Sequence, residues 1–207
     1  MKLINTLLFI FIAFAIFLIL PFACKAQDVY SGCPMMGDKA GRTAILDSLK
    51  NRYVIPGKYS PINFNEMASM TVDTKKHTAH EAVEIQGYVV EVKYGGSETC
   101  NCHTKDKTLF DTHIVLMVDD KQHGRGEGVV VEISPRIRAM MAAKGIDWTT
   151  NNIKKCFLNK WVTVSGYLFD DEEHKQNSTA DSPHGTNNWR ATCWEVHPVT
   201  DIQFAKP

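Results

Sequence analysis

The sequence predicts a mainly β domain in which five strands close into a barrel, behind a helical N-terminal extension. The chain has 207 residues, which suits one domain of ordinary size with terminal additions. Its hydrophobic fraction of 44% and charged fraction of 22% are close to globular averages and exclude disordered, collagen-like and coiled-coil chains. From His80 onward the apolar residues change from helical spacing to the alternation typical of strands.

Five segments rich in Val, Ile and Thr are predicted to be strands. The first is long, and its apolar face switches at Gly87, which predicts a bent strand that serves two sheets. The last is expected to be interrupted at Pro198. The five segments are residues 82–94, 108–118, 128–133, 161–169 and 192–204.

A helix is predicted over residues 136–144, between the third and fourth strands. Ser134 and Pro135 are a favourable cap and first-position pair, and Gly145 follows the segment. A second short helix is expected over residues 149–158. Three strands, a helix and two more strands are the order of the OB-fold, a five-stranded Greek-key barrel. A generic small α+β sandwich is the alternative.

Residues 27–79 form the predicted helical extension, and the barrel occupies residues 80–207. A break at residues 56–61 separates an amphipathic helix over 38–52 from a short helix over 65–70. The apolar side of the first helix is expected to contain Ala40, Ala44, Ile45, Leu49 and Tyr53.

The first 26 residues are typical of a secretory signal. Lys2 supplies the positive charge, and residues 7–20 are apolar up to Pro21, which is short for a membrane span. A retained N-terminal anchor is the alternative. Cleavage after Ala26 would discard Cys24, whereas a lipoprotein signal would leave Cys24 acylated. We therefore expect a periplasmic, secreted or lipid-anchored protein, with the membrane contacted only through the signal or a lipid.

The charge balance argues against nucleic acid as the partner. Lys and Arg number 23 and so do Asp and Glu, and removal of residues 1–26 leaves a formal charge of −2. Such a chain has no positive field to attract a phosphate backbone. An oligosaccharide or an envelope protein is the favoured partner.

Five cysteines follow the signal, and export would place them in a compartment where disulfides form. Because five is odd, at least one thiol is free, metal-bound or paired with another chain. The sequence Cys100-Asn101-Cys102-His103 concentrates soft donors. A disulfide from this loop to Cys193 or Cys156 is favoured, and the alternative is a metal or redox site formed by Cys100, Cys102, His103 and His184.

Several motifs of the sequence are specific: Gly32-Cys33-Pro34 with Gly37-Asp38, residues 98–103, Asp111-Thr112-His113-Ile114, and residues 188–200. The chain resembles a family of uncharacterised exported bacterial proteins of Bacteroidetes type, over roughly residues 30–204. The resemblance implies an OB-like barrel in an envelope or secreted protein, and it implies no reaction.

Two carboxylate-x-His pairs are the candidate catalytic residues. Asp111 and His113 share one face of the second strand, and Glu195 and His197 share one face of the last, pointing outward. Together with a loop histidine, these donors suit Zn²⁺ or Mn²⁺ and would support a metal-dependent hydrolase of phosphodiester or similar bonds. Structural roles are the alternative, such as an ion pair between Glu195 and an arginine.

Aromatic and basic residues near the strand ends support a different class, an OB-like ligand-binding or interaction module. Trp189, Arg190 and Tyr94 are the candidate ligand-binding residues. Exposed aromatic rings on an OB barrel stack on sugars or bases. Packing in the core is the alternative for each ring.

Overall fold

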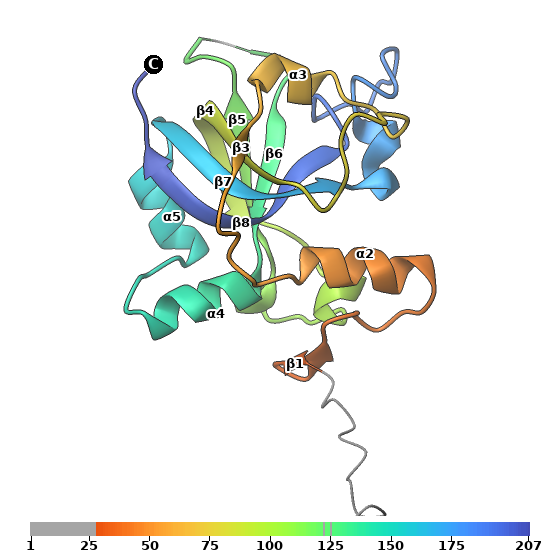
Figure 1. Ribbon diagram of the computed structural model, residues 1–207, viewed down its shortest axis with the longest axis vertical. Coiled ribbons are helices and arrows are strands. Elements are labelled where there is room, and N and C mark those ends of the chain that lie inside the picture. The colour runs from red at the N-terminus through yellow and green to blue at the C-terminus, as the bar shows by residue number, and fades with distance from the viewer. Residues whose placement is uncertain (1–27, 122, 125) are drawn as a thin grey trace, which may run out of the picture.

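The computed structural model describes residues 28–121, 123–124 and 126–207 (Figure 1). The predicted signal segment and the fate of Cys24 lie outside these residues. Within the described part of the chain, the helices are all too short or too polar to cross a membrane. The barrel strands are β4 (Ala82–Tyr94), β5 (Thr112–Met117), β6 (Val129–Ile133), β7 (Trp161–Asp170) and β8 (Trp194–Phe204).

The strand order confirms the predicted OB-like barrel. Neighbouring strands run β4-β5-β6-β8-β7, and β4 also pairs with β7, which closes the sheet. The pair β6–β8 is parallel, with Val131 opposite Val196, and the other four pairs are antiparallel. This is the Greek-key order of an OB barrel.

The bend predicted in β4 lies where the strand changes partner. Residues 82–88 pair with β7 and residues 88–94 pair with β5, with a bulge between Val89 and Glu91. A Cβ atom on Gly87 would lie 3.0 Å from Leu116 Cβ and 3.1 Å from the Met117 carbonyl oxygen. Glycine therefore allows β5 to approach closely at the bend.

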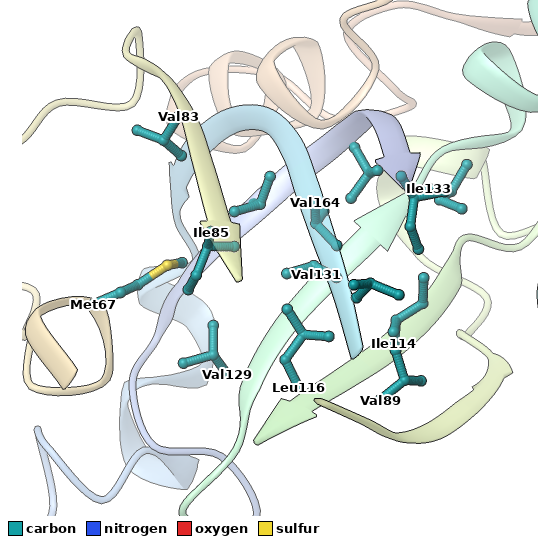
Figure 2. Packing of buried hydrophobic residues seen from close by; sticks show 14 of the residues in the cluster. Met67, Val83, Ile85, Val89, Ile114, Leu116, Val129, Val131, Ile133 and Val164 are labelled. Carbon is teal, nitrogen blue, oxygen red and sulfur yellow. The ribbon is translucent and has the colours of Figure 1, made fainter. Parts of the chain in front are cut away.

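The barrel core is built from inward-facing branched side chains of all five strands (Figure 2). Met67 closes the core from α3 (Phe64–Ala68), whose first turn is capped by the Asn63 side chain. Burial of a Val, Leu or Ile side chain contributes about 1.5–3 kcal/mol. The centre is formed by Val83, Ile85, Val89, Ile114, Leu116, Val129, Val131, Ile133, Val164, Leu168, Val196 and Val199.

The two predicted helices between β6 and β7 are present. α4 (Pro135–Ala143) begins with the Ser134 hydroxyl accepting a hydrogen bond from the Ile137 amide. α5 (Thr150–Phe157) begins in the same way at Thr149. Ile137 and Ile153 anchor these helices to the core.

The second predicted strand begins later than the alternation indicates. Residues 107–109 form a turn of 3₁₀ helix, capped by the Asp106 side chain, and β5 begins only at Thr112. The hydrogen bonds that Asp106 accepts from Thr108 favour this turn over an extended strand.

The N-terminal extension differs most from its prediction. It contains β1 (Val29–Tyr30), β2 (Cys33–Pro34), α2 (Arg42–Lys50) and β3 (Ser60–Pro61), which pairs in parallel with β4. α2 begins at Arg42, not at residue 38, because Gly41 has φ 68° and cannot continue a right-handed helix. Its buried side includes Leu46 and Lys50, whereas Ile45, expected inside, is 60% exposed.

The last strand is continuous, so the interruption expected at Pro198 is wrong. The irregularity lies in its pairing instead, where the register against β7 shifts on both sides of Gly166. A Cβ atom on Gly166 would lie 2.4 Å from the Pro198 carbonyl oxygen and 3.0 Å from Val199 Cα. Proline is accommodated because β7 carries no side chain at the closest point.

Replacement of Gly166 by alanine is expected to destabilise the barrel by about 2 kcal/mol, since its Cβ would lie too close to the backbone at Pro198 and Val199 and to the Val196 side chain. Urea unfolding of the variant would measure the change. Gly57→Ala is the control, because a Cβ there meets nothing within 4 Å. Equal stabilities for the two variants would contradict the proposed close approach.

Candidate functional site

Charged side chains cover the outer face of β5, β6 and β8. Val131, Ile133 and Val196 point into the core, so Glu132, Glu195 and His197 point the other way. The predicted face is correct, but these side chains are not at the surface, because α2 and the loops at 98–103 and 171–192 lie over them. We name this set the buried charged network: Lys50, Glu98, Asp111, His113, Glu132, Asp171, Arg190, Glu195 and His197.

His197 is at the centre of the network and is fully buried. Its Nδ1 atom lies 3.4 Å from Glu195 Oε2 and 3.5 Å from Glu132 Oε2, and its Nε2 atom lies 3.9 Å from Asp111 Oδ1. Burial lowers the pKa of an imidazole, but Glu132 and the other carboxylates outweigh it and raise the pKa of His197. Burial raises the pKa of Asp111 to about 6, although His197 opposes the shift.

Arg190 holds the acidic side of the network. Its guanidinium is fully buried and bonds to Glu195, while Nη1 lies 3.3 Å from Asp171 Oδ2 and Nε donates to the Thr192 carbonyl. Burial alone would lower the pKa of Arg190, but Glu195 and Asp171 keep it raised. The structural ion pair considered for Glu195 is therefore present. Arg190 was predicted to bind a ligand; in this arrangement its side chain is fully buried, and the role stays a prediction.

Lys50 brings α2 onto the network. Its Nζ atom lies 2.9 Å from Glu98 Oε2 and 5.6 Å from the centre of the Phe169 ring. Burial opposes the charge of Lys50, yet Asp171 and Glu98 raise its pKa above the usual value. The positive charge therefore stays on a buried lysine, and the helix is tied to the barrel by it.

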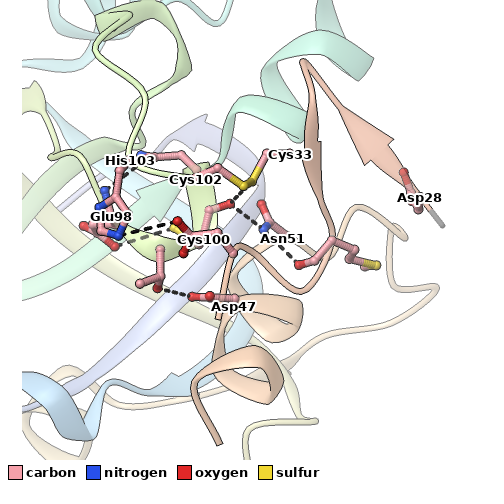
Figure 3. The surroundings of a disulfide bond; sticks show 12 residues. Asp28, Cys33, Asp47, Asn51, Glu98, Cys100, Cys102 and His103 are labelled. Atoms are coloured by element: carbon pink, nitrogen blue, oxygen red, sulfur yellow. Dashed lines mark hydrogen bonds and ion pairs between the residues drawn. A yellow bond between two sulfur atoms is a disulfide. The ribbon is translucent and has the colours of Figure 1, made fainter. Parts of the chain in front are cut away.

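The disulfide joins Cys33 to Cys102, with the two Cα atoms 5.6 Å apart (Figure 3). The predicted pairing with Cys193 or Cys156 is wrong: both are free, Cys193 buried and Cys156 exposed. The bond fastens the segment that carries β2 to the loop beside Glu98. It also indicates an oxidising environment.

The four predicted thiol-site ligands do not gather at one point. Cys102 is consumed by the disulfide, and His103 is half-exposed, 3.7 Å from Asp38 Oδ2. His184 is exposed on the loop before β8. Cys100 alone joins the network, with its thiol 3.6 Å from Glu98 Oε2 and 3.9 Å from Asp111 Oδ2. Burial raises the pKa of this thiol, which keeps it protonated and unreactive.

Glu132 is the main residue of the network that sequence reasoning missed. It lies 2.9 Å from His113 in an ion contact without hydrogen-bond geometry, and it also faces His197. The available signal was a single carboxylate within the apolar run of β6. Such a residue is buried only with a partner.

The charge of His113 makes stability depend on pH. Burial lowers its pKa, but Glu132, Glu195 and Glu98 outweigh burial and raise it to about 9, from 6.5. Since the folded state holds the proton more tightly, this stability is complete below pH 6.5 and is lost as pH rises through 9. The shift corresponds to about 3 kcal/mol.

We therefore expect the free energy of unfolding, measured in the presence of a metal chelator, to fall between pH 6.5 and 9. The variant His113→Gln should show a smaller fall over the same pH range. His184→Gln on the exposed loop is the control and should leave the profile unchanged. A fall of the same size in His113→Gln would show that another group is responsible.

An open groove adjoins the network on the same outer face. It has a volume of about 380 Å³ and lies over β4 and β5, between the loop after β5 and the loop that carries Trp189. The indole of Trp189 lies 5.8 Å from Lys93 Nζ and 5.0 Å from the Arg190 guanidinium. We name it the Trp189 groove, lined by Val90, Glu91, Lys93, Val115, Met117, His123, Gly124, Gly126 and Trp189.

Tyr94, also predicted to bind the ligand, is not among the residues that line this groove. It is half-buried at the end of β4, opposite Thr112. Of the three predicted ligand-binding residues, the structure therefore places Trp189 alone on the groove.

Comparison with protein-family models and with curated proteins finds no match. Among solved structures, the chain is similar to a putative aspartyl-tRNA synthetase from Leishmania major Friedlin, with a TM-score of 0.35 and 13% identity. The alignment covers 74% of this chain and 22% of the synthetase, so the chain spans about a fifth of that protein's length.

Proposed function

We propose that this protein is an exported OB-like ligand-binding module, and that its ligand binds in the Trp189 groove. The observation that carries the proposal is the indole of Trp189 beside Lys93 on an open groove of about 380 Å³. Small-molecule sites have volumes of about 300–1,000 Å³. OB domains bind oligosaccharides and oligonucleotides on an outer face between two loops.

The chemistry of the groove favours a sugar. An aromatic ring stacks on the apolar face of a sugar, and Lys93 and Glu91, whose side chains are 2.7 Å apart, offer a donor and an acceptor for hydroxyl groups. Arg190, held by the network, packs on Trp189 and limits its motion, so little entropy is lost on binding. An oligosaccharide of the envelope is the proposed ligand class.

Export is part of the same proposal. It is supported by the Cys33–Cys102 disulfide, by the apolar N-terminal segment and by the motif resemblance to exported bacterial proteins.

The alternative hypothesis, a metal-dependent hydrolase, receives less support. Three of its candidate residues are almost completely buried: Asp111 is 4% exposed, Glu195 1% and His197 0%. A substrate cannot touch these side chains in this conformation. The catalytic roles therefore stay a sequence-based hypothesis.

Titration of tryptophan fluorescence with short oligosaccharides of N-acetylglucosamine and of hexoses tests the proposal. We expect saturable binding that Trp189→Leu weakens about tenfold, since loss of one stacking ring costs about 1–3 kcal/mol. Trp161→Leu is the matched control, because that indole packs on Tyr88 at the start of β7. Absence of sugar binding, or equal affinity in Trp189→Leu, would refute the sugar proposal.

A further inference from the structure

We propose that Asp111, Glu132 and His197 together bind one divalent metal ion, Zn²⁺ or Mn²⁺. One ligand atom from each residue lies within 4.8 Å of the other two. The three residues come from adjacent strands, because β6 carries Glu132 between His197 on β8 and the residue just before β5. This inference concerns a different set of atoms from the Trp189 groove and does not depend on it.

The imidazole of His197 supplies independent support. Its Nε2 atom is buried, points toward Asp111 and has no hydrogen-bond partner among the residues described. A buried polar atom left without a partner costs about 1–3 kcal/mol. A metal ion bound to Nε2 in place of a proton would give this buried atom a partner.

Each proposed ligand is already oriented by an outer partner. Glu195 contacts Nδ1 of His197 and can accept a hydrogen bond from it, which would leave Nε2 for a metal ion. His113 contacts Oε1 of Glu132, and Oε2 of Glu132 lies 3.5 Å from Nδ1 on the edge of the His197 ring. Metal sites in proteins have such second partners behind the ligands.

Two other histidines also contact two carboxylates each, and they can be compared with His197. His77 has Glu81 on Nδ1 and Glu66 on Nε2, and His123 has Glu127 on Nδ1 and Asp119 on Nε2. At His197 one atom from the ring and one from each of Asp111 and Glu132 lie within 4.8 Å of one another, whereas among the described residues neither His77 nor His123 belongs to such a group, so these two histidines are suitable controls.

The neighbouring group Glu98, Cys100 and Asp111 also meets the distance condition. In that group Glu98 is already paired with Lys50 at 2.9 Å. The remaining set of two carboxylates and one imidazole contains nitrogen and oxygen donors, which suit Zn²⁺ and Mn²⁺.

The test uses the full chain, exported in a bacterial host and purified without chelator. We expect elemental analysis to find near one Zn²⁺ or Mn²⁺ per chain. The stripped protein should bind added Zn²⁺, and His197→Gln and Glu132→Gln should lower the affinity at least tenfold, whereas His77→Gln and His123→Gln should not. Failure of the wild-type protein to bind either ion, or equal loss in the controls, would overturn the proposal.

A second measurement covers the case in which the buried variants do not fold. X-ray absorption of the zinc-loaded wild-type protein should show nitrogen and oxygen ligands with one imidazole and no sulfur. A sulfur ligand, lost in Cys100→Ser, would place the ion at the neighbouring group and overturn the assignment.

Discussion

Replacement of Arg190 by methionine is expected to lower the free energy of unfolding by about 3–5 kcal/mol. Methionine removes the buried positive charge that Glu195 and Asp171 share and leaves each carboxylate with only a histidine contact, which costs more than the lost contact. The side chain is fully buried, so water cannot compensate. Urea unfolding at neutral pH, followed by circular dichroism, measures the loss.

A matched substitution separates burial from charge. Arg42 also pairs with a glutamate, Glu172, but its side chain is 67% exposed. Arg42→Met should therefore change stability by less than about 1 kcal/mol. The double variant Arg190→Met/Glu195→Gln should lose less than the sum of the single variants, because it removes both members of the pair. A loss below 1 kcal/mol in Arg190→Met would show that the pair is not a stabilising contact.

Removal of the disulfide is the second large effect. The bond between Cys33 and Cys102 closes a separation of 69 residues, and a crosslink over such a loop typically contributes about 2–4 kcal/mol by restricting the unfolded chain. We expect the double variant Cys33→Ser/Cys102→Ser to lose that amount under non-reducing conditions. The wild-type protein in reductant should lose a similar amount.

Cys156→Ser is the control for this substitution, since that thiol is free and exposed. The disulfide also holds the segment around β2 beside the loop that covers the network. Amide hydrogen exchange in residues 98–103 should therefore become faster in the double variant. Unchanged stability and unchanged exchange would contradict the view that the bond fastens this cover.

The barrel followed from patterns that act over a few residues. Alternation placed the five strands, Gly87 marked the bend in β4, and Ser134 with Pro135 marked the start of α4. The same kind of signal was insufficient for α2. The spacing of its apolar residues extended the predicted helix back to residue 38, whereas the positive φ at Gly41 makes the helix begin at Arg42.

The candidate site shows more sharply how little local sequence patterns say about burial. Alternation correctly put His113, Glu195 and His197 on the outer face, and the three-dimensional structure brings Asp111, just before β5, and Glu195 close to His197. The alternation gave no indication that Lys50 and the loop around Glu98 bury that face.

What the sequence by itself determined is the succession of strands and helices along the chain, which favours an OB-like barrel, and the outward face of His113, Glu195 and His197, because propensity and capping depend on near neighbours. What only the tertiary structure decided is the pairing of Cys33 with Cys102, the burial of the network and the position of Trp189 on an open groove. These depend on distances between segments far apart in the chain, and the free energies of desolvation and ion pairing change steeply with those distances.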